Sequence, residues 1–268
     1  MAETKKSLNI FILTSVFPRH HYFAYMVSRS FPNVSTIVIE DKSEIKNPKS
    51  ILEDKYLQSW KRLELDTFYS FEKKNRQCNS HIIKSVRVGE INSRKTIEHL
   101  ASLATGKEIV VVFGTSIIKE ELIEIFYGRI INLHLGLSPY YRGVATNLVP
   151  FFYGEPQYVG ATVHHLNKGI DSGNILAQGR PTINPKTDSV DTIGAKTIKV
   201  GVDLVLRVLE LYKIGKQPMG VAQDKRQGKL IMKADLTDEV FTGIERNVKN
   251  GLILNYVPIP ISIVKLPL

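Results

Sequence analysis

The sequence predicts an α/β fold: a Rossmann-like, mostly parallel sheet with helices on both faces, plus a small C-terminal appendage. Short, nearly continuous apolar runs at residues 8–15, 34–39, 108–113 and 130–135 are typical of strands buried on both faces of a parallel sheet. Between the first two runs, residues 20–31 carry apolar side chains at helical spacing. A strand, a helix and a strand in close succession indicate the right-handed crossover of such folds.

The remaining elements follow in chain order. Residues 42–88 are polar and favour helices packed on the sheet, with Trp60 in the core. Residues 93–104 and 119–126 are predicted helices, and residues 114–116 form a turn between them. Residues 136–180 alternate turn signals with short strands, and residues 189–214 form one long helix. Residues 216–268 hold a hairpin-like segment, GKLIMK, and a helix at 238–250. We therefore expect a domain at residues 1–215 and an extension at residues 216–268.

Composition limits the classes of protein to consider. The 268 residues carry a net charge of +10, which suits anionic partners such as phosphorylated metabolites, folates or nucleic acid, although the basic residues form no stripe. The single cysteine, Cys78, excludes an internal disulfide and a cysteine-based metal cluster. No apolar run reaches the roughly 18 residues that a membrane span needs, and the N-terminal run is typical of a strand rather than a signal peptide. We expect a cytoplasmic protein without membrane association.

Several well-known motifs are missing from the sequence. It contains no G-x-G-x-x-G dinucleotide fingerprint, no G-x-x-x-x-G-K-[ST] phosphate loop, no H-E-x-x-H and no G-x-S-x-G. Ligands of open α/β sheets bind at the carboxyl ends of the strands. A ligand of this sheet must therefore be held there by other groups.

A polar pair stands out on the strand at residues 130–135. Asn132 and His134 are two residues apart, so both side chains point to one face, while Ile131 and Leu133 point to the other. An amide and an imidazole side by side can donate hydrogen bonds to the same oxygen. This arrangement suits the stabilisation of an oxyanion on a tetrahedral intermediate.

A carboxylate follows in the segment G-I-D-S-G. We expect Gly169 and Gly173 to hold this loop in a tight, irregular shape. A carboxylate of Asp171 beside His134 would raise the pKa of the imidazole, orient it and help to relay a proton from an attacking nucleophile. Together, the three side chains would suit acyl transfer to an amine without a covalent enzyme intermediate.

Two other interpretations of these residues stay open. Structural hydrogen bonding accounts for most N-x-H pairs on strands, and a D-x-G segment is usually a turn. His164 and His165 add the alternative of a metal site with His134 and Asp171. Adjacent strand residues face opposite ways, so only one of the two histidines could join such a site.

Four blocks of sequence, taken in order, resemble the formyltransferase family: N-L-H at 132–134, L-S-P-Y-Y-R-G at 137–143, G-A-T-V-H at 160–164 and G-I-D-S-G at 169–173. The family includes the formyltransferases of glycinamide ribonucleotide, of methionyl-tRNA and of nucleotide-linked amino sugars. The resemblance is strongest over residues 108–180. It implies a Rossmann-like sheet that binds N10-formyltetrahydrofolate as co-substrate, needs no metal and brings an acceptor amine to the formyl carbon.

The resemblance also implies roles for particular residues. The family's catalytic Asn, His and Asp map onto Asn132, His134 and Asp171; the first two would stabilise the oxyanion, with Asp171 keeping His134 charged. The chain has L-G-L-S-P after the histidine where the family has text close to P-S-L-L-P, so no role passes to Ser138. The implied folate pocket comprises Gly114, Thr115, Ser116, Ile117, Ile118, Leu166, Asn167, Lys168, Gly169 and Ile170. The residues predicted to bind the acceptor are Tyr140, Tyr141, Arg142 and Gly143. A structural role for these residues is an equally weighted alternative.

The acceptor follows by elimination within the family. Residues 216–268 are short for the family's tRNA-binding domain, so tRNA and other nucleic acids are less expected as partners. The first strand–helix turn lacks the glycine of the glycinamide ribonucleotide enzymes, although Arg19, His20 and His21 could contact a phosphate there. A small amine, most simply a nucleotide-linked amino sugar, is the expected acceptor. A formyltetrahydrofolate hydrolase and a non-catalytic folate- or nucleotide-binding protein stay open, and a homodimer is a further expectation.

Overall fold

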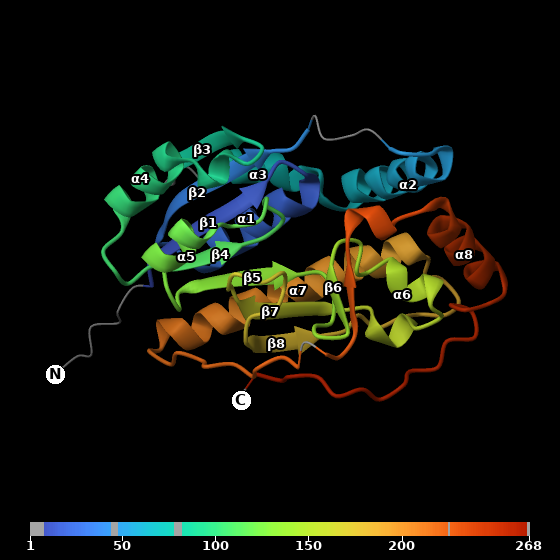
Figure 1. Ribbon diagram of the computed structural model, residues 1–268. Helices are drawn as coiled ribbons and strands as arrows, with labels where there is room; N and C mark the ends of the chain where they lie inside the picture. Colours follow the sequence, from blue (N-terminus) through green and yellow to red (C-terminus); the bar gives the residue numbers. More distant parts are fainter. Residues whose placement is uncertain (1–7, 44–47, 78–81, 225, 267–268) are drawn as a thin grey trace.

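A seven-stranded sheet forms the centre of the molecule (Figure 1). The computed structural model describes residues 8–43, 48–77, 82–224 and 226–266. The strand order is β3-β2-β1-β4-β5-β7-β8. The first five strands in this order run parallel, β7 runs antiparallel to both of its neighbours, and β8 therefore runs in the same direction as the first five. This confirms the mostly parallel sheet. The strands are β1 (Ile10–Ser15), β2 (Val34–Asp41), β3 (Ile82–Arg87), β4 (Ile109–Val112), β5 (Ile130–His134), β7 (Ala161–His165) and β8 (Ile175–Gly179).

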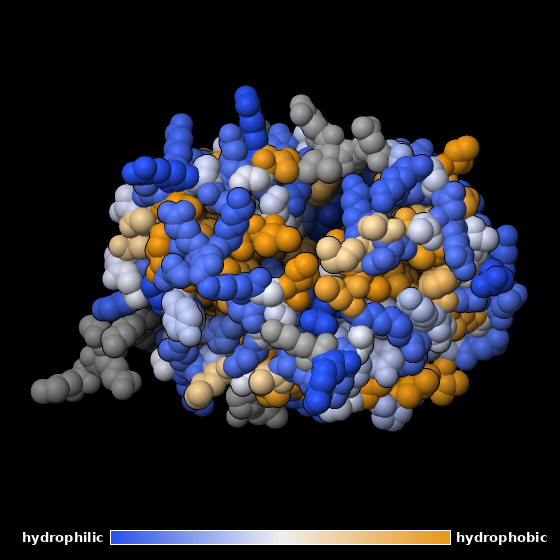
Figure 2. Space-filling model, viewed as in Figure 1, coloured by the Kyte–Doolittle hydropathy of each residue, from blue (hydrophilic) through white to orange (hydrophobic). Residues whose placement is uncertain are grey.

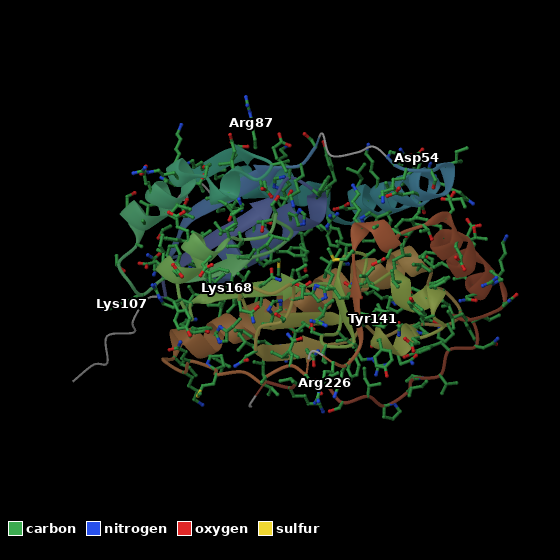
Figure 3. The ribbon with its side chains drawn as sticks, in the orientation of Figure 1. Asp54, Arg87, Lys107, Tyr141, Lys168 and Arg226 are labelled. Carbon is green, nitrogen blue, oxygen red and sulfur yellow. The ribbon has the colours of Figure 1, made fainter. Side chains whose placement is uncertain are left out.

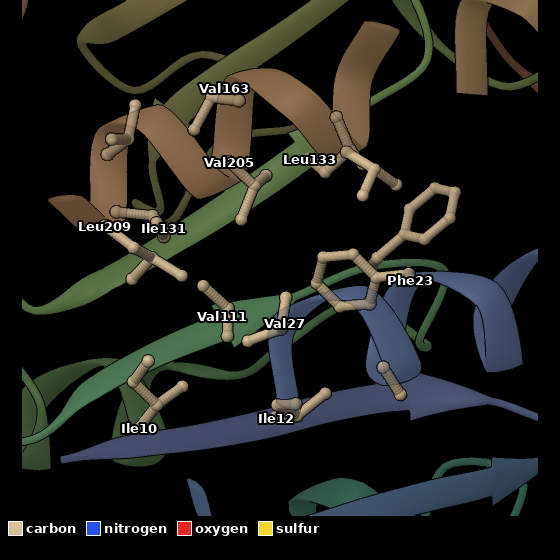
Figure 4. Close-up of a cluster of buried hydrophobic side chains, with 14 of the residues drawn as sticks. Ile10, Ile12, Phe23, Val27, Val111, Ile131, Leu133, Val163, Val205 and Leu209 are labelled. Atoms are coloured by element: carbon tan, nitrogen blue, oxygen red, sulfur yellow. The ribbon is translucent and has the colours of Figure 1, made fainter. Parts of the chain in front are cut away.

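Helices cover both faces of the sheet, as predicted. Ile10 and Ile12 of β1 pack in one cluster with α1 and α7, and Figure 4 shows Phe23 of α1 in this cluster. The alternate residues Phe11 and Leu13 pack on the other face, against α4 and α5. Because strand side chains alternate, each apolar run supplies both cores. The helices are α1 (Pro18–Ser30), α2 (Ile51–Phe68), α3 (Ser70–Gln77), α4 (Arg94–Leu103), α5 (Glu120–Ile125) and α7 (Val190–Lys213).

Serine side chains set the starts of three of these helices. Ser50 accepts from the Glu53 amide and Ser93 from the Thr96 amide, at the N-termini of α2 and α4. Ser189 begins α7 with a reciprocal capping box to Thr192. Trp60 of α2 packs against α7, where a Cβ on Gly194 would lie 3.1 Å from its ring. Trp60 is only partly buried and packs against the edge of the first core.

The C-terminal residues form a second layer beside β5. Strands β6 (Tyr141–Gly143) and β9 (Lys229–Ile231) pair in parallel as a separate two-stranded sheet, so the predicted hairpin at GKLIMK is wrong. Helices α6 (Val149–Phe152) and α8 (Asp238–Lys249) close a third core, in which Tyr141 and Phe151 meet Ile231 and Phe241. Short 3-10 helices lie at η1 (Glu90–Asn92), η2 (Pro156–Tyr158) and η3 (Lys233–Asp235). Among the described residues, no helix combines the length and apolarity required to cross a membrane.

Residues 42–88 were predicted to favour helices packed on the sheet, but the last part of this range forms strand β3. It is an edge strand, which buries Val86 but leaves Ile83 49% exposed, so it lacks the apolar run of a central strand. Its partner β2 also continues beyond the predicted apolar run, through Glu40 and Asp41. Glu40 is fully buried there. Cys78 lies outside the described residues.

Candidate active site

Strand β5 places Asn132 and His134 on the same face, as their spacing predicts. Their neighbours Ile131 and Leu133 point into the first core on the opposite face. Both polar residues lie at the carboxyl end of β5, where it pairs with β4 on one side and β7 on the other. The side chain of His134 is only 6% exposed. The buried strand therefore presents a fixed amide and imidazole to the edge of the sheet where open α/β proteins bind ligands.

Asp171 meets this pair from the loop between β7 and β8. Its Oδ2 lies 3.2 Å from Nδ1 of His134 and accepts a hydrogen bond from the Gly143 amide at 2.9 Å. Asp171 itself has the left-handed backbone conformation, with φ of 44°, which aspartate tolerates better than most residues. Gly169 and Gly173 instead permit close approach: a Cβ on Gly173 would lie 1.7 Å from the His165 carbonyl oxygen. The two glycines thus allow the tight loop that the sequence predicts.

His164 completes the cluster from strand β7. Its Nδ1 donates to the His165 carbonyl at 2.8 Å, so its Nε2 carries a lone pair and accepts from Nδ2 of Asn132 at 3.1 Å. Asp171 Oδ1 lies 3.5 Å from both nitrogens. His164 therefore fixes the amide with its nitrogen toward the centre of the site. His165 faces away and contacts the Pro218 carbonyl, which confirms that only one of the two histidines joins. No cluster suited to a metal ion was found within the described ranges.

Burial and the neighbouring groups act in opposite directions on the pKa values of His134 and Asp171. Burial lowers the pKa of His134, and the Asp171 carboxylate opposes but does not overcome it. The prediction that Asp171 keeps His134 charged in the resting protein is therefore wrong. Burial would raise the pKa of Asp171, but His134 and the hydrogen bond from the Gly143 amide bring that pKa well below its usual range. These directions favour an ionised carboxylate beside a neutral imidazole.

The neutral His134 ring is arranged to accept a proton. Its Nε2 lies 3.0 Å from the Tyr141 carbonyl oxygen, and its Nδ1 faces the Asp171 carboxylate. Both neighbours are acceptors, whereas a neutral imidazole has only one hydrogen to donate. A second proton on the ring would satisfy both contacts at once. The His134–Asp171 pair can therefore hold the proton that an attacking group gives up.

A cavity of about 500 Å³ opens beside these side chains, within the usual size of small-molecule sites. Figure 2 shows apolar side chains gathered around a hollow on this face. Nine of the ten predicted folate residues line the cavity: Gly114, Thr115, Ser116, Ile117, Ile118, Leu166, Asn167, Gly169 and Ile170. Lys168 does not, because it pairs with Glu120 of α5 on the outer surface, as its position in Figure 3 shows.

The predicted acceptor residues separate into two groups. Gly143 lines the cavity, but Tyr140, Tyr141 and Arg142 do not. Tyr141 lies on β6, where its hydroxyl donates to Glu155 and its ring is buried in the third core (Figure 3). Arg142 is 8% exposed. Tyr141 and Arg142 lie on β6 and are buried, which favours the structural alternative for these two residues. Tyr140 precedes β6, is half-buried and lines a second, smaller cavity.

Sequence reasoning gave no site role to several residues that line the cavity, among them Thr146, Ile231 and Met232. Ile231 and Met232 come from the C-terminal extension, and no local pattern connects them to β5. His20 of α1 also lines the cavity. It is 1% exposed, lies edge-to-face with Phe113 at 4.8 Å, and would clash with a Cβ on Gly114 at 2.1 Å. Gly114, with φ of 76°, must therefore be glycine.

Acid should destabilise the protein through His20. Burial, followed by the charges of Arg19 and Lys42, places its pKa well below 6.5 in the folded state. The unfolded chain then binds more protons below pH 6.5, so stability is complete above that pH and falls as pH decreases from it, by up to about 1.4 kcal/mol per pH unit per proton. We expect His20→Phe, which keeps the ring contacts, to lessen this fall in urea unfolding between pH 7.5 and 5.5. An undiminished fall would assign it to other groups.

Part of the chain matches curated proteins. Methionyl-tRNA formyltransferase of Thermodesulfovibrio yellowstonii is 34% identical over 119 residues, which are 44% of this chain and 38% of that protein. The enzyme of Borrelia duttonii is 35% identical over 119 residues, 44% of this chain and 37% of that protein. The matches thus span well under half of these curated relatives.

Solved structures share the fold over most of the chain. A sugar N-formyltransferase from Shewanella sp FDAARGOS_354 aligns with a TM-score of 0.57 and 19% identity, covering 90% of this chain and 87% of that one. Phosphoribosylglycinamide formyltransferase from Anaplasma phagocytophilum aligns with a TM-score of 0.53 and 16% identity, covering 85% and 99%. At these identities the likeness establishes the fold alone. A family model described as formyl transferase matches residues 65–209, more than half of the chain. The chain belongs to the formyl transferase family.

Proposed function

We propose that the protein transfers a formyl group from N10-formyltetrahydrofolate to a primary amine of a small acceptor, most simply a nucleotide-linked amino sugar. One observation carries the proposal: Asn132, His134 and Asp171 converge within hydrogen-bond reach at a cavity lined by both segments implied to hold folate. An apolar wall at Ile117 and Ile118 with polar backbone around it suits a flat heteroaromatic ring.

The side chains support a stepwise transfer. The acceptor nitrogen bonds to the formyl carbon, and the carbonyl oxygen gains a negative charge that the Asn132 amide can stabilise. The amine loses a proton to the neutral His134–Asp171 pair, which makes the imidazole cationic beside the oxyanion. When the bond from carbon to N10 breaks, that proton passes to N10 of the leaving tetrahydrofolate. No atom of the protein becomes covalently attached.

The start of α1 argues against an acceptor anchored by a phosphate at the first strand–helix turn. The backbone amide and the guanidinium of Arg19 both donate to Oε1 of Glu64, at 3.1 and 2.7 Å. Glu64 is 4% exposed, so the protein's own carboxylate takes the place of an anion at this helix terminus. This disfavours glycinamide ribonucleotide and a phosphate contact through Arg19.

A second acceptor is favoured by a separate observation. The curated relatives that match are methionyl-tRNA formyltransferases, whereas an N-formyltransferase of Helicobacter canadensis, with a TM-score of 0.57 and 16% identity, was solved with folinic acid and dTDP-3-aminofucose. Methionyl-tRNA is therefore the alternative acceptor. The amino sugar is preferred because residues 216–266 help to close the cavity through Ile231 and Met232 rather than forming a separate surface.

Release of tetrahydrofolate from N10-formyltetrahydrofolate tests the proposal. The assay should include nucleotide-linked amino sugars, methionyl-tRNA, glycinamide ribonucleotide and a reaction without an amine. We expect release that depends on an amino sugar. Release with methionyl-tRNA only would establish the alternative acceptor, and release without an amine would indicate a hydrolase. Folded protein that binds folate but releases nothing would contradict catalysis.

A further inference from the structure

Glu40 is a buried carboxylate at the carboxyl end of β2 that the transfer chemistry does not use. It is fully buried, and its two oxygens accept hydrogen bonds from the backbone amides of Gly89 and Ser116, both at 2.6 Å. Lys42 lies 3.3 Å from Oε2. The backbone carbonyl of Glu40 accepts from Ser15 at the end of β1. One residue thus ties together the ends of β1 and β2 and the turns after β3 and β4.

The turn after β4 is the cavity wall at residues 114–118, and its shape depends on such contacts. It has no helix or strand of its own, and Gly114 has a positive φ. Lys42 donates to the Gly114 carbonyl at 3.0 Å while Glu40 accepts from the Ser116 amide. In the second half of the turn, Asn92 donates to the Ile117 carbonyl at 2.9 Å and accepts from the Lys119 amide at 2.7 Å. Side chains from outside the turn therefore hold both of its halves.

We propose that Glu40 is a positioning residue for the donor substrate: through Ser116 and Lys42 it fixes the wall at residues 114–118 against which the folate ring binds. The inference rests on the proposed function, because it takes folate as the ligand of that wall. Glu40 touches neither the substrate nor the reacting atoms. Its effect is on the affinity and orientation of the donor, not on the proton transfers at His134 and Asp171.

Glu40→Gln tests the proposal with little change of shape. An amide keeps one acceptor oxygen for two amide donors, so either Gly89 or Ser116 loses its partner, and Lys42 loses its counter-ion. We expect the dissociation constant for 5-formyltetrahydrofolate, a stable analogue of the donor, to rise about 10-fold. The KM for the donor should rise with it, while kcat at saturating donor stays within about twofold.

Glu108→Gln is the matched control. Glu108 is also fully buried, accepts from the amides of Thr105 and Gly106 at 2.6 and 3.0 Å, and lies 3.5 Å from Arg129. It stands at the opposite end of the sheet, just before β4 begins. Both variants should lose thermal stability to a similar degree, but only Glu40→Gln should lose donor affinity.

Asn92→Ala keeps the proposal testable if Glu40→Gln does not fold. It removes the other support of the wall without unpairing a buried charge, and we expect about a threefold weaker binding of 5-formyltetrahydrofolate. Two results would overturn the proposal for Glu40 and leave the proposed function intact. One is an equal loss of affinity in Glu40→Gln and Glu108→Gln. The other is unchanged affinity in both Glu40→Gln and Asn92→Ala. Failure of the wild-type protein to bind the analogue would overturn the proposed function and this inference with it.

Discussion

Asp171→Asn should reduce kcat/KM for formyl transfer about 1,000-fold, within the range that general acid–base groups contribute. The substitution removes the charge that lies 3.2 Å from His134 and leaves the side chain's size unchanged. The imidazole then becomes cationic beside a neutral amide, so taking the amine's proton costs more. Rapid-mixing measurements of tetrahydrofolate release, at several donor concentrations, give the effect on kcat and KM separately.

Asparagine is a better replacement here than alanine. Asp171 has a φ of 44°, a conformation that asparagine tolerates better than alanine. Asp171→Ala would therefore combine loss of the carboxylate with backbone strain. Asp188→Asn is the matched control: its carboxylate side chain is 5% exposed and accepts from Lys196 at 2.7 Å, but it lies beside the start of α7. We expect turnover within about twofold of wild type in that variant.

The pH profile provides a second measure of the same pair. If the neutral imidazole takes the proton, kcat/KM falls as pH decreases through the pKa of His134, which burial places below 6.5. The Asp171 carboxylate raises that pKa, so its removal should lower it. The acid limb of the residual activity of Asp171→Asn should therefore lie at a lower pH than that of wild type. An acid limb at the same pH in both proteins would mean that His134 is not the group that titrates, and turnover within about threefold of wild type would contradict the role of Asp171.

The strength of the sequence prediction depended on how local each feature is. Apolar runs such as the one containing Ile10 and Ile12 identified the central strands, because a strand buried on both faces carries its signal in consecutive residues. Strand β3 buries one side only, and β6 pairs with β9 across more than 80 residues of chain. Neither has a signal within its own few residues, so both were missed or misassigned.

The site shows the same division. The two-residue spacing of Asn132 and His134 fixed their shared face, and that prediction held because a strand has only two faces. The burial that lowers the pKa of His134 outweighs the carboxylate of Asp171, and the two-residue spacing does not indicate how deeply a side chain is buried. Tyr141 resembled a site residue because of its neighbours, but pairing with β9 placed its ring in a core. The spacing of residues thus predicted which face of the strand a side chain occupies, but not how deeply that side chain is buried.

Asn132→Leu should lower kcat about 100- to 1,000-fold with little change in KM, because an amide that donates to the oxyanion acts in the transition state. His164 holds the Asn132 nitrogen at 3.1 Å, and Asp171 Oδ1 lies 3.5 Å away, too far for a strong hydrogen bond. One N–H of the Asn132 amide is thus firmly hydrogen-bonded to His164, and the other is held only loosely by Asp171. The second N–H is the one an oxyanion can take.

The same geometry predicts a graded series that separates orientation from chemistry. His164→Leu keeps the Asn132 amide but releases it from its partner, so kcat should fall about 10-fold, less than in Asn132→Leu. His165→Leu, next on the same strand and facing away, should leave turnover near wild type. Asn247→Leu, which removes an amide bonded to Phe151 and Phe152 far from the cavity, controls for loss of two hydrogen bonds. If Asn132→Leu and Asn247→Leu retained equal kcat, the oxyanion would have to be stabilised by a group other than Asn132.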